Sequence, residues 1–134
     1  MSDAALRLVM AALLSAAVGL EREFTHKAAG LRTHMLVGLG AALFTIVGSI
    51  LGDTRIAAQV VTGVGFLGAG AIFLNGGSVR GMTTAAGLWS VAAVGVAVGA
   101  GYVALASLAT GVALVVLFAL KPIDDRLHRR QELP

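Results

Sequence analysis

The stretch that decides the fold runs from Gly81 to Leu120: GMTTAAGLWSVAAVGVAVGAGYVALASLATGVALVVLFAL. It contains no charged side chain. As a single helix it would extend about 60 Å, which is roughly twice the hydrocarbon core of a bilayer. The stretch therefore predicts two membrane-spanning helices joined by a tight turn at residues 99–101. We expect the chain to be an integral membrane protein.

The composition of the 134-residue chain supports that expectation. Hydrophobic residues make up 57% and charged residues 13%, and the mean hydropathy is +0.90, unlike a soluble globular domain. The absence of cysteine excludes disulfides, thiol catalysis and thiolate metal sites. The net charge of +3 is small, and the basic residues lie in predicted loops and the tail. Contact with lipid headgroups is therefore expected, and nucleic-acid binding is not.

Polar residues divide the chain into five predicted spans of an all-α, polytopic transmembrane bundle. The spans are expected at residues 4–20, 33–52, 56–74, 84–98 and 102–120. They form one transmembrane domain over residues 1–120, with a glycine-rich third span. A short basic tail follows at residues 121–134, where a short amphipathic helix would act as a surface anchor. Four spans with one re-entrant apolar segment is the alternative.

Lysine and arginine are distributed unevenly between the two predicted sides of the membrane. Eight lie in the first loop, the third loop and the tail, whereas the other side has Arg55 and, near the N-terminus, Arg7. Basic residues concentrate in cytoplasmic loops. We therefore expect the first loop and the tail in the cytoplasm and the N-terminus outside.

Glycines in the third and fourth predicted spans suggest close helix packing. The run from Gly63 to Gly68 matches a dinucleotide-binding fingerprint, but no acidic residue occurs between Asp53 and Asp124 to bind a ribose. Helix packing is preferred, and a broken helix whose carbonyls bind an ion is the alternative. Packing within one chain or in a homodimer or small homo-oligomer remains open. The residues expected to pack are Gly63, Gly65, Gly68, Gly70, Gly87, Gly95 and Gly99.

The first predicted loop is the richest polar region. Glu21 directly follows the last apolar residue of the first span, so an unpaired carboxylate there would be costly. We expect Glu21, Arg22 and Arg32 to form a buried or half-buried charge network, and the alternative is a solvated connector. The wider predicted polar network consists of Glu21, Arg22, Glu23, Lys27, Arg32, Asp53, Arg55 and Gln59.

Oxygen ligands for a metal ion are available but not specific. Glu21, Glu23 and Asp53 are the candidate ligands, because magnesium needs only one or two carboxylates besides water. Their spacing does not distinguish magnesium from a proton or an arginine as the partner. The histidines His26, His34 and His128 show no zinc spacing.

Local roles are predicted for several other polar and aromatic residues. Asp53 or Thr54 is expected to cap the third span, and Thr83 or Thr84 the fourth. Gln59 is expected to hydrogen-bond across helices. Trp89 is expected to pack inside the bundle. No nucleophile–base arrangement is present, so we expect neither an enzyme nor a cofactor.

Three ordered motifs resemble the MgtC/SapB membrane protein family. They are Glu21-Arg-Glu with Lys27-Ala-Ala-Gly-Leu-Arg-Thr-His34, the stretch from Arg55 to Gly70, and Gly81-Met-Thr-Thr-Ala-Ala-Gly-Leu-Trp89. The resemblance covers about residues 19–102. Asp53 is followed by Thr54 where the family usually has proline.

The resemblance implies a bacterial inner-membrane protein linked to growth at low magnesium and to virulence. Such proteins are thought to restrain the rotary ATP synthase through a membrane contact. Many members continue into a soluble ACT-like domain, and here we expect the transmembrane domain alone. A non-enzymatic regulator acting through helix contacts is the preferred function, and a small cation or proton transporter or channel is the alternative.

Overall fold

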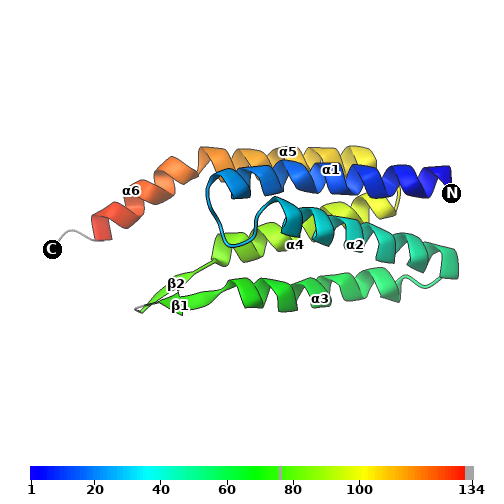
Figure 1. Ribbon diagram of the computed structural model, residues 1–134, viewed down its shortest axis with the longest axis horizontal. Helices are drawn as coiled ribbons and strands as arrows, with labels where there is room; N and C mark the ends of the chain where they lie inside the picture. The colour runs from blue at the N-terminus through cyan, green and yellow to red at the C-terminus, as the bar shows by residue number, and fades with distance from the viewer. Residues whose placement is uncertain (76, 132–134) are drawn as a thin grey trace.

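The computed structural model describes residues 1–75 and 77–131, in which five apolar helices run antiparallel to their neighbours along the chain (Figure 1). Residues 132–134 of the predicted tail lie outside the described residues. The elements are α1 (Ser2–Phe24), α2 (Leu31–Leu51), α3 (Arg55–Ala71), β1 (Phe73–Asn75), β2 (Ser78–Arg80), α4 (Met82–Gly99), α5 (Val103–Ala119) and α6 (Lys121–Gln131).

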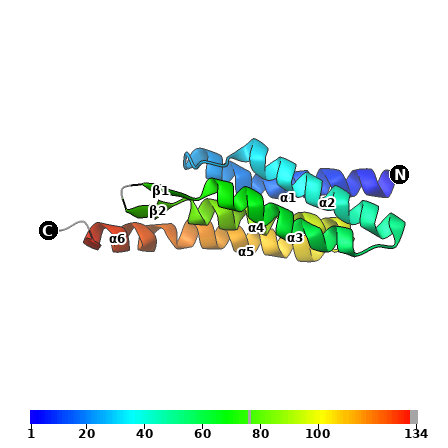
Figure 2. The same ribbon diagram turned by 90° about the horizontal axis from the view of Figure 1, so that it is seen from below.

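The predicted all-α, polytopic transmembrane bundle is confirmed. Helices α1, α2, α4 and the segment Val103–Leu127 are long and apolar enough to cross a membrane. Helix α3 has 17 residues, which gives a length of about 25 Å against a bilayer core of about 30 Å. Both α6 and the β1–β2 hairpin extend beyond the end of the bundle that carries the first loop (Figures 1 and 2).

The third predicted span is shorter than expected, and a hairpin follows it. Helix α3 ends at Ala71, and strand β1 pairs with β2 in antiparallel register, Phe73 opposite Arg80. The hairpin is followed by Gly81, which has φ of 89°. A Cβ at Gly81 would collide with the carbonyl of Ala71. Glycine is therefore needed where the chain passes from hairpin to helix.

Helix α4 lies at the centre of the bundle and contacts α1, α2, α3 and α5. Its Val91 and Val98 are fully buried. A Cβ added at Gly95 would collide with the Gly38 carbonyl of α2, and one added at Gly99 would lie 2.6 Å from the carbonyl oxygen of Ala42. These glycines let the backbones of α2 and α4 approach closely.

The glycines of α3 behave differently from those of α4. A Cβ added at Gly68 would lie 3.5 Å from the Cβ of Ala85, an ordinary contact. At Gly63, Gly65 and Gly70 it would meet nothing within 4 Å. Within the described chain these three glycines therefore make no close helix contact, and their packing against another molecule stays a prediction.

The helix ends differ in part from the predictions. Helix α4 begins at Met82 with Gly81 as N-cap and no side-chain cap, so the capping roles of Thr83 and Thr84 are wrong. Thr54 is at the N-cap of α3, also without a side-chain cap. The turn at 99–101 is present, with Gly101 at φ of 94°.

Trp89 contributes to the outer surface of the bundle, and Arg7 contributes to the turn at 99–101. Trp89 is 55% exposed, against the expectation that it packs inside. At the turn, the Arg7 guanidinium donates to the Gly99 carbonyl at 2.9 Å and pairs with Asp3 at 2.7 Å. Arg7 thereby satisfies a carbonyl at the end of α4, where a positive charge is favourable.

Candidate functional site

A buried ion pair lies near the C-terminal end of α1. Glu21 is 5% exposed and Arg22 is 3% exposed. The Arg22 Nη1 lies 3.4 Å from the Glu21 Oε2, and its Nη2 lies 3.5 Å from the Thr84 Oγ1 of α4. Among the described residues, the Arg22 Nε has no hydrogen-bond partner. The guanidinium is thus buried with long contacts and unused donor capacity.

His34, near the start of α2, is a second buried polar side chain at this end of the bundle. It is fully buried, and its Nδ1 lies 2.9 Å from the Gly30 carbonyl oxygen, to which it donates in the matching tautomer. A Cβ added at Gly19 would lie 3.1 Å from the His34 Cβ, and one added at Gly87 would lie 3.2 Å from its Nε2. Glycines on α1 and α4 therefore provide the space for the ring.

Two further buried polar atoms lack partners among the described residues. They are the His34 Nε2 and the Ser15 Oγ. Ser15 packs against Gly38 of α2. Sequence analysis did not assign His34 a role, because a single histidine without ligand spacing carries no signal. The glycines that make its space lie on other helices.

The other charged residues of the first loop are exposed. Glu23 accepts a hydrogen bond from the Leu31 N–H at 2.8 Å, so its carboxylate serves the free N-terminus of α2. Arg32 and Lys27 are exposed. The expected place of Arg32 in a buried network is therefore wrong, because Arg32 lies in the first turn of α2 on its outward face. The buried partner of Glu21 is Arg22.

Asp53 and Arg55 lie at the opposite end of the bundle, in the α2–α3 connection (Figure 1). The Arg55 Nε and Nη2 donate to the two Asp53 carboxylate oxygens, each at 2.9 Å. The hydrogen bonds from the Arg55 side chain, and then its backbone N–H, hold the pKa of Asp53 below its ordinary value. The pair is exposed, with the Arg55 side chain 87% accessible.

The predicted candidate metal ligands do not converge. Glu21 and Glu23 belong to the last turns of α1, whereas Asp53 belongs to the α2–α3 connection, and these two segments lie at opposite ends of the bundle (Figure 1). Within the part of the chain that the structure describes, no group of three or more His, Asp or Glu residues could hold a metal ion.

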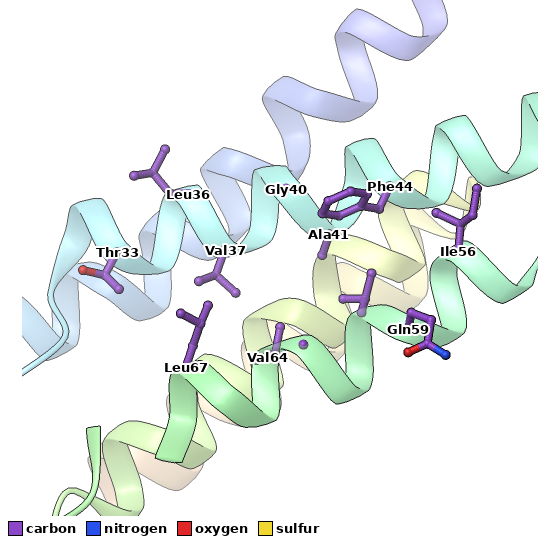
Figure 3. A pocket seen from close by; sticks show the side chains of 12 residues that line it. Thr33, Leu36, Val37, Gly40, Ala41, Phe44, Ile56, Gln59, Val64 and Leu67 are labelled. Atoms are coloured by element: carbon purple, nitrogen blue, oxygen red, sulfur yellow. The ribbon is translucent and has the colours of Figure 1, made fainter. Parts of the chain in front are cut away.

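An apolar groove of about 790 Å³ separates α2 from α3 (Figure 3). Gly40 and Gly63 open its walls, since a Cβ at either position would meet nothing within 4 Å. Gln59 lines the groove and is exposed. Within residues 1–75 and 77–131 its amide makes no hydrogen bond, so the expected bond across helices is not formed. The lining residues are Thr33, Leu36, Val37, Gly40, Ala41, Phe44, Ile56, Gln59, Val60, Gly63, Val64 and Leu67.

These features define a polytopic helical membrane protein with a charged pair buried at one end and an open groove on one side. A family model described as the MgtC family matches residues 8–126. The chain belongs to this family, as the three sequence motifs predicted.

Curated relatives are similar along most of this chain. Protein MgtC of Brucella suis is 50% identical over 125 residues, which is 90% of this chain and 52% of that protein. The putative magnesium transporter YhiD of Escherichia coli K12 is 42% identical over 137 residues, covering 93% and 64%. Protein MgtC of Salmonella typhimurium is 42% identical over 127 residues, covering 92% and 55%.

The chain therefore spans about half to two thirds of the length of these relatives. A search of solved structures found no significant match.

Proposed function

We propose that this chain is a non-enzymatic membrane regulator that acts through contacts between its helices and those of a partner. The α2–α3 groove is the observation that supports this proposal. It has one glycine on each wall, Gly40 of α2 and Gly63 of α3, and a Cβ at either position would meet nothing within 4 Å. Small residues are what membrane helices use to approach closely. A partner helix could pack there without displacing any side chain of the chain itself.

The cellular role we propose is adaptation to low magnesium. Family membership and the relative named a putative magnesium transporter support the link to magnesium. The family resemblance also suggests the rotary ATP synthase as a partner and a role in virulence. A second copy of this chain, in a homodimer or small homo-oligomer, is the other partner that the groove would fit.

Capture of partners in mild detergent tests the proposal. The groove variant Gly63→Leu should lose the partner recovered with the unchanged protein, because leucine fills the space that the partner backbone needs. Gly111→Leu on α5 is the matched control, since a Cβ at Gly111 also meets nothing within 4 Å and the residue lies outside the groove. Mass measurement in nanodiscs identifies self-association. Equal recovery with both variants would contradict a role for the groove.

Cation or proton transport is the second candidate function, and the buried cluster of Glu21, Arg22 and His34 favours it. Ionisable residues at membrane depth commonly mark ion pathways. Flux measurement in proteoliposomes separates the two functions. Transport requires cation or proton movement above that of empty vesicles, and this movement should fall in Glu21→Gln. The regulator requires none.

We propose the bacterial inner membrane as the location, with the N-terminus outside and α6 in the cytoplasm. The concentration of lysine and arginine at the end with the first loop, the hairpin and α6 supports this orientation. The chain has no cysteine, so single cysteines introduced at Thr54 and Arg126 report each end separately. In intact cells an impermeant thiol reagent should label the first and spare the second. The reverse pattern would invert the orientation.

A further inference from the structure

A second polar region lies beside the buried ion pair, where the end of α1, the start of α4 and the α5–α6 junction meet. A cavity of about 410 Å³ opens there. Its lining combines charged and apolar side chains, which is unusual for the surface of a membrane helix. The lining residues are Glu21, Arg22, Lys27, Thr83, Val116, Leu117, Leu120, Lys121, Ile123, Asp124, Asp125 and Leu127.

Arg22 is the reason to expect an anion in this cavity. Its guanidinium carries five N–H donors, yet its two polar contacts measure 3.4 and 3.5 Å and its Nε has no partner among the described residues. Charge-assisted hydrogen bonds are normally about 2.7–2.9 Å long. A buried cation with such long contacts would gain free energy from an additional anionic oxygen. Lys27 and Lys121 add two exposed cations to the same lining.

The cavity continues into an apolar groove between α4 and α5. This groove has a volume of about 700 Å³ and shares Thr83, Val116 and Leu117 with the polar cavity. Helices α4 and α5 contact each other, and residues of both line this groove. The polar cavity thus adjoins an apolar groove that follows two membrane helices. A lipid has the same two parts, a polar headgroup that fits the cavity and an acyl chain that fits the groove.

We propose that this site binds one membrane phospholipid, with its phosphate at Arg22, Lys27 and Lys121 and an acyl chain along the α4–α5 groove. The lining has three cations, Arg22, Lys27 and Lys121, and three carboxylates, Glu21, Asp124 and Asp125. Because these formal charges balance and Glu21 already faces Arg22, a singly charged phosphodiester fits better than a doubly charged inorganic phosphate. Basic pockets between membrane helices on the cytoplasmic side commonly hold lipid headgroups. The site uses other helices than the α2–α3 groove and does not depend on the proposed function.

The single tryptophan of the chain provides the measurement. Trp89 lines the α4–α5 groove, so a lipid with brominated acyl chains should quench its fluorescence when bound. The protein is titrated in mild detergent with brominated phosphatidylglycerol and with brominated diacylglycerol of the same chains. Phosphatidylglycerol should quench at concentrations about tenfold lower, since only it has the phosphate. Equal potency of the two lipids would overturn the proposal.

Substitutions of exposed residues test the headgroup contacts without unfolding the bundle. Lys27→Gln combined with Lys121→Gln should weaken quenching by phosphatidylglycerol several-fold and leave quenching by diacylglycerol unchanged. Arg126→Gln is the matched control, because Arg126 is exposed on α6 and does not line the cavity. An unchanged response in the double variant would overturn the site.

Inorganic phosphate separates a lipid from a free anion as the ligand. At millimolar concentration it should not displace brominated phosphatidylglycerol, because it cannot occupy the apolar groove. If inorganic phosphate abolished the quenching, the cavity would be an anion site and not a phospholipid site.

Discussion

Helices α3 and α4 carry the same sequence signature, spaced glycines in an apolar segment, and use it in opposite ways. In α4, Gly95 and Gly99 lie against the α2 backbone. In α3, Gly63 and Gly65 face open space. A small-residue motif therefore identifies a helix that can be approached closely, but not whether its neighbour belongs to the same chain. The open face is the one available to a partner.

The largest loss of stability should come from replacing a glycine of α4 by a larger residue. In Gly95→Leu the new side chain would collide with the Gly38 carbonyl, which is backbone and cannot rotate away. The cost should exceed the about 1–3 kcal/mol of ordinary overpacking, and we expect no folded protein by size-exclusion chromatography in detergent. Gly111→Leu serves as control and should elute normally. A well-folded Gly95→Leu would show that α2 and α4 are not in close contact.

The second-largest loss of stability should come from breaking the buried Glu21–Arg22 ion pair near the end of α1, whose arginine also contacts Thr84 of α4. Glu21→Gln would leave the Arg22 charge buried without its partner, and losing one member of a buried pair costs about 3–5 kcal/mol. Thermal unfolding in detergent should show a large decrease in melting temperature. Replacing both residues, Glu21→Gln with Arg22→Met, should recover most of it, because no buried charge then remains. Continued loss in the double variant would mean that packing, and not charge, explains the effect.

Sequence alone could predict the number and order of the apolar helices and the turn at 99–101, because hydropathy and charge fix them. It could not assign the neighbours of each glycine, because that depends on which face of a helix turns inward. Arg22 is instructive. Ala11, Ser15, Val18, Gly19 and Arg22 are all buried and share one face of α1.

That spacing supports the predicted burial of Arg22, but it gives no reason to bury Arg32, which the prediction also included. It becomes visible only if α1 continues beyond Leu20 to Phe24, whereas the predicted span ends at Leu20, before the charged run that begins at Glu21. His34 could not be found this way, because its space is made by glycines from α1 and α4. The hairpin was missed because Phe73 and Leu74 of β1 continue the apolar pattern of α3.

The third prediction is that replacing glycine by alanine changes the stability in opposite directions in the two helices. Gly63→Ala in α3 should stabilise the chain by up to about 1 kcal/mol, because alanine favours helix and meets nothing there. Gly95→Ala in α4 should destabilise it, since the Cβ would also lie 2.8 Å from that of Ala41. Denaturation in detergent measures both variants on the same scale. Destabilisation by Gly63→Ala in the isolated chain would show that the α3 face is already packed.

The smallest effect should come from the exposed ion pair at the start of α3. Asp53→Asn removes a carboxylate that is paired with Arg55 but exposed, and such surface pairs often contribute nothing measurable. The Arg55 hydrogen bonds lower the pKa of Asp53, so whatever the pair contributes is present at neutral pH and lost as the pH falls through that lowered pKa. Any difference in melting temperature between Asp53→Asn and the unchanged chain should therefore be slight at pH 7, begin to shrink near about pH 4 and disappear only below the lowered pKa. Raising the salt concentration should also reduce it. A loss as large as that of Glu21→Gln would mean that Asp53 is buried by a contact absent from the isolated chain, and the distinction between an inner α4 and an outer α3 would fail.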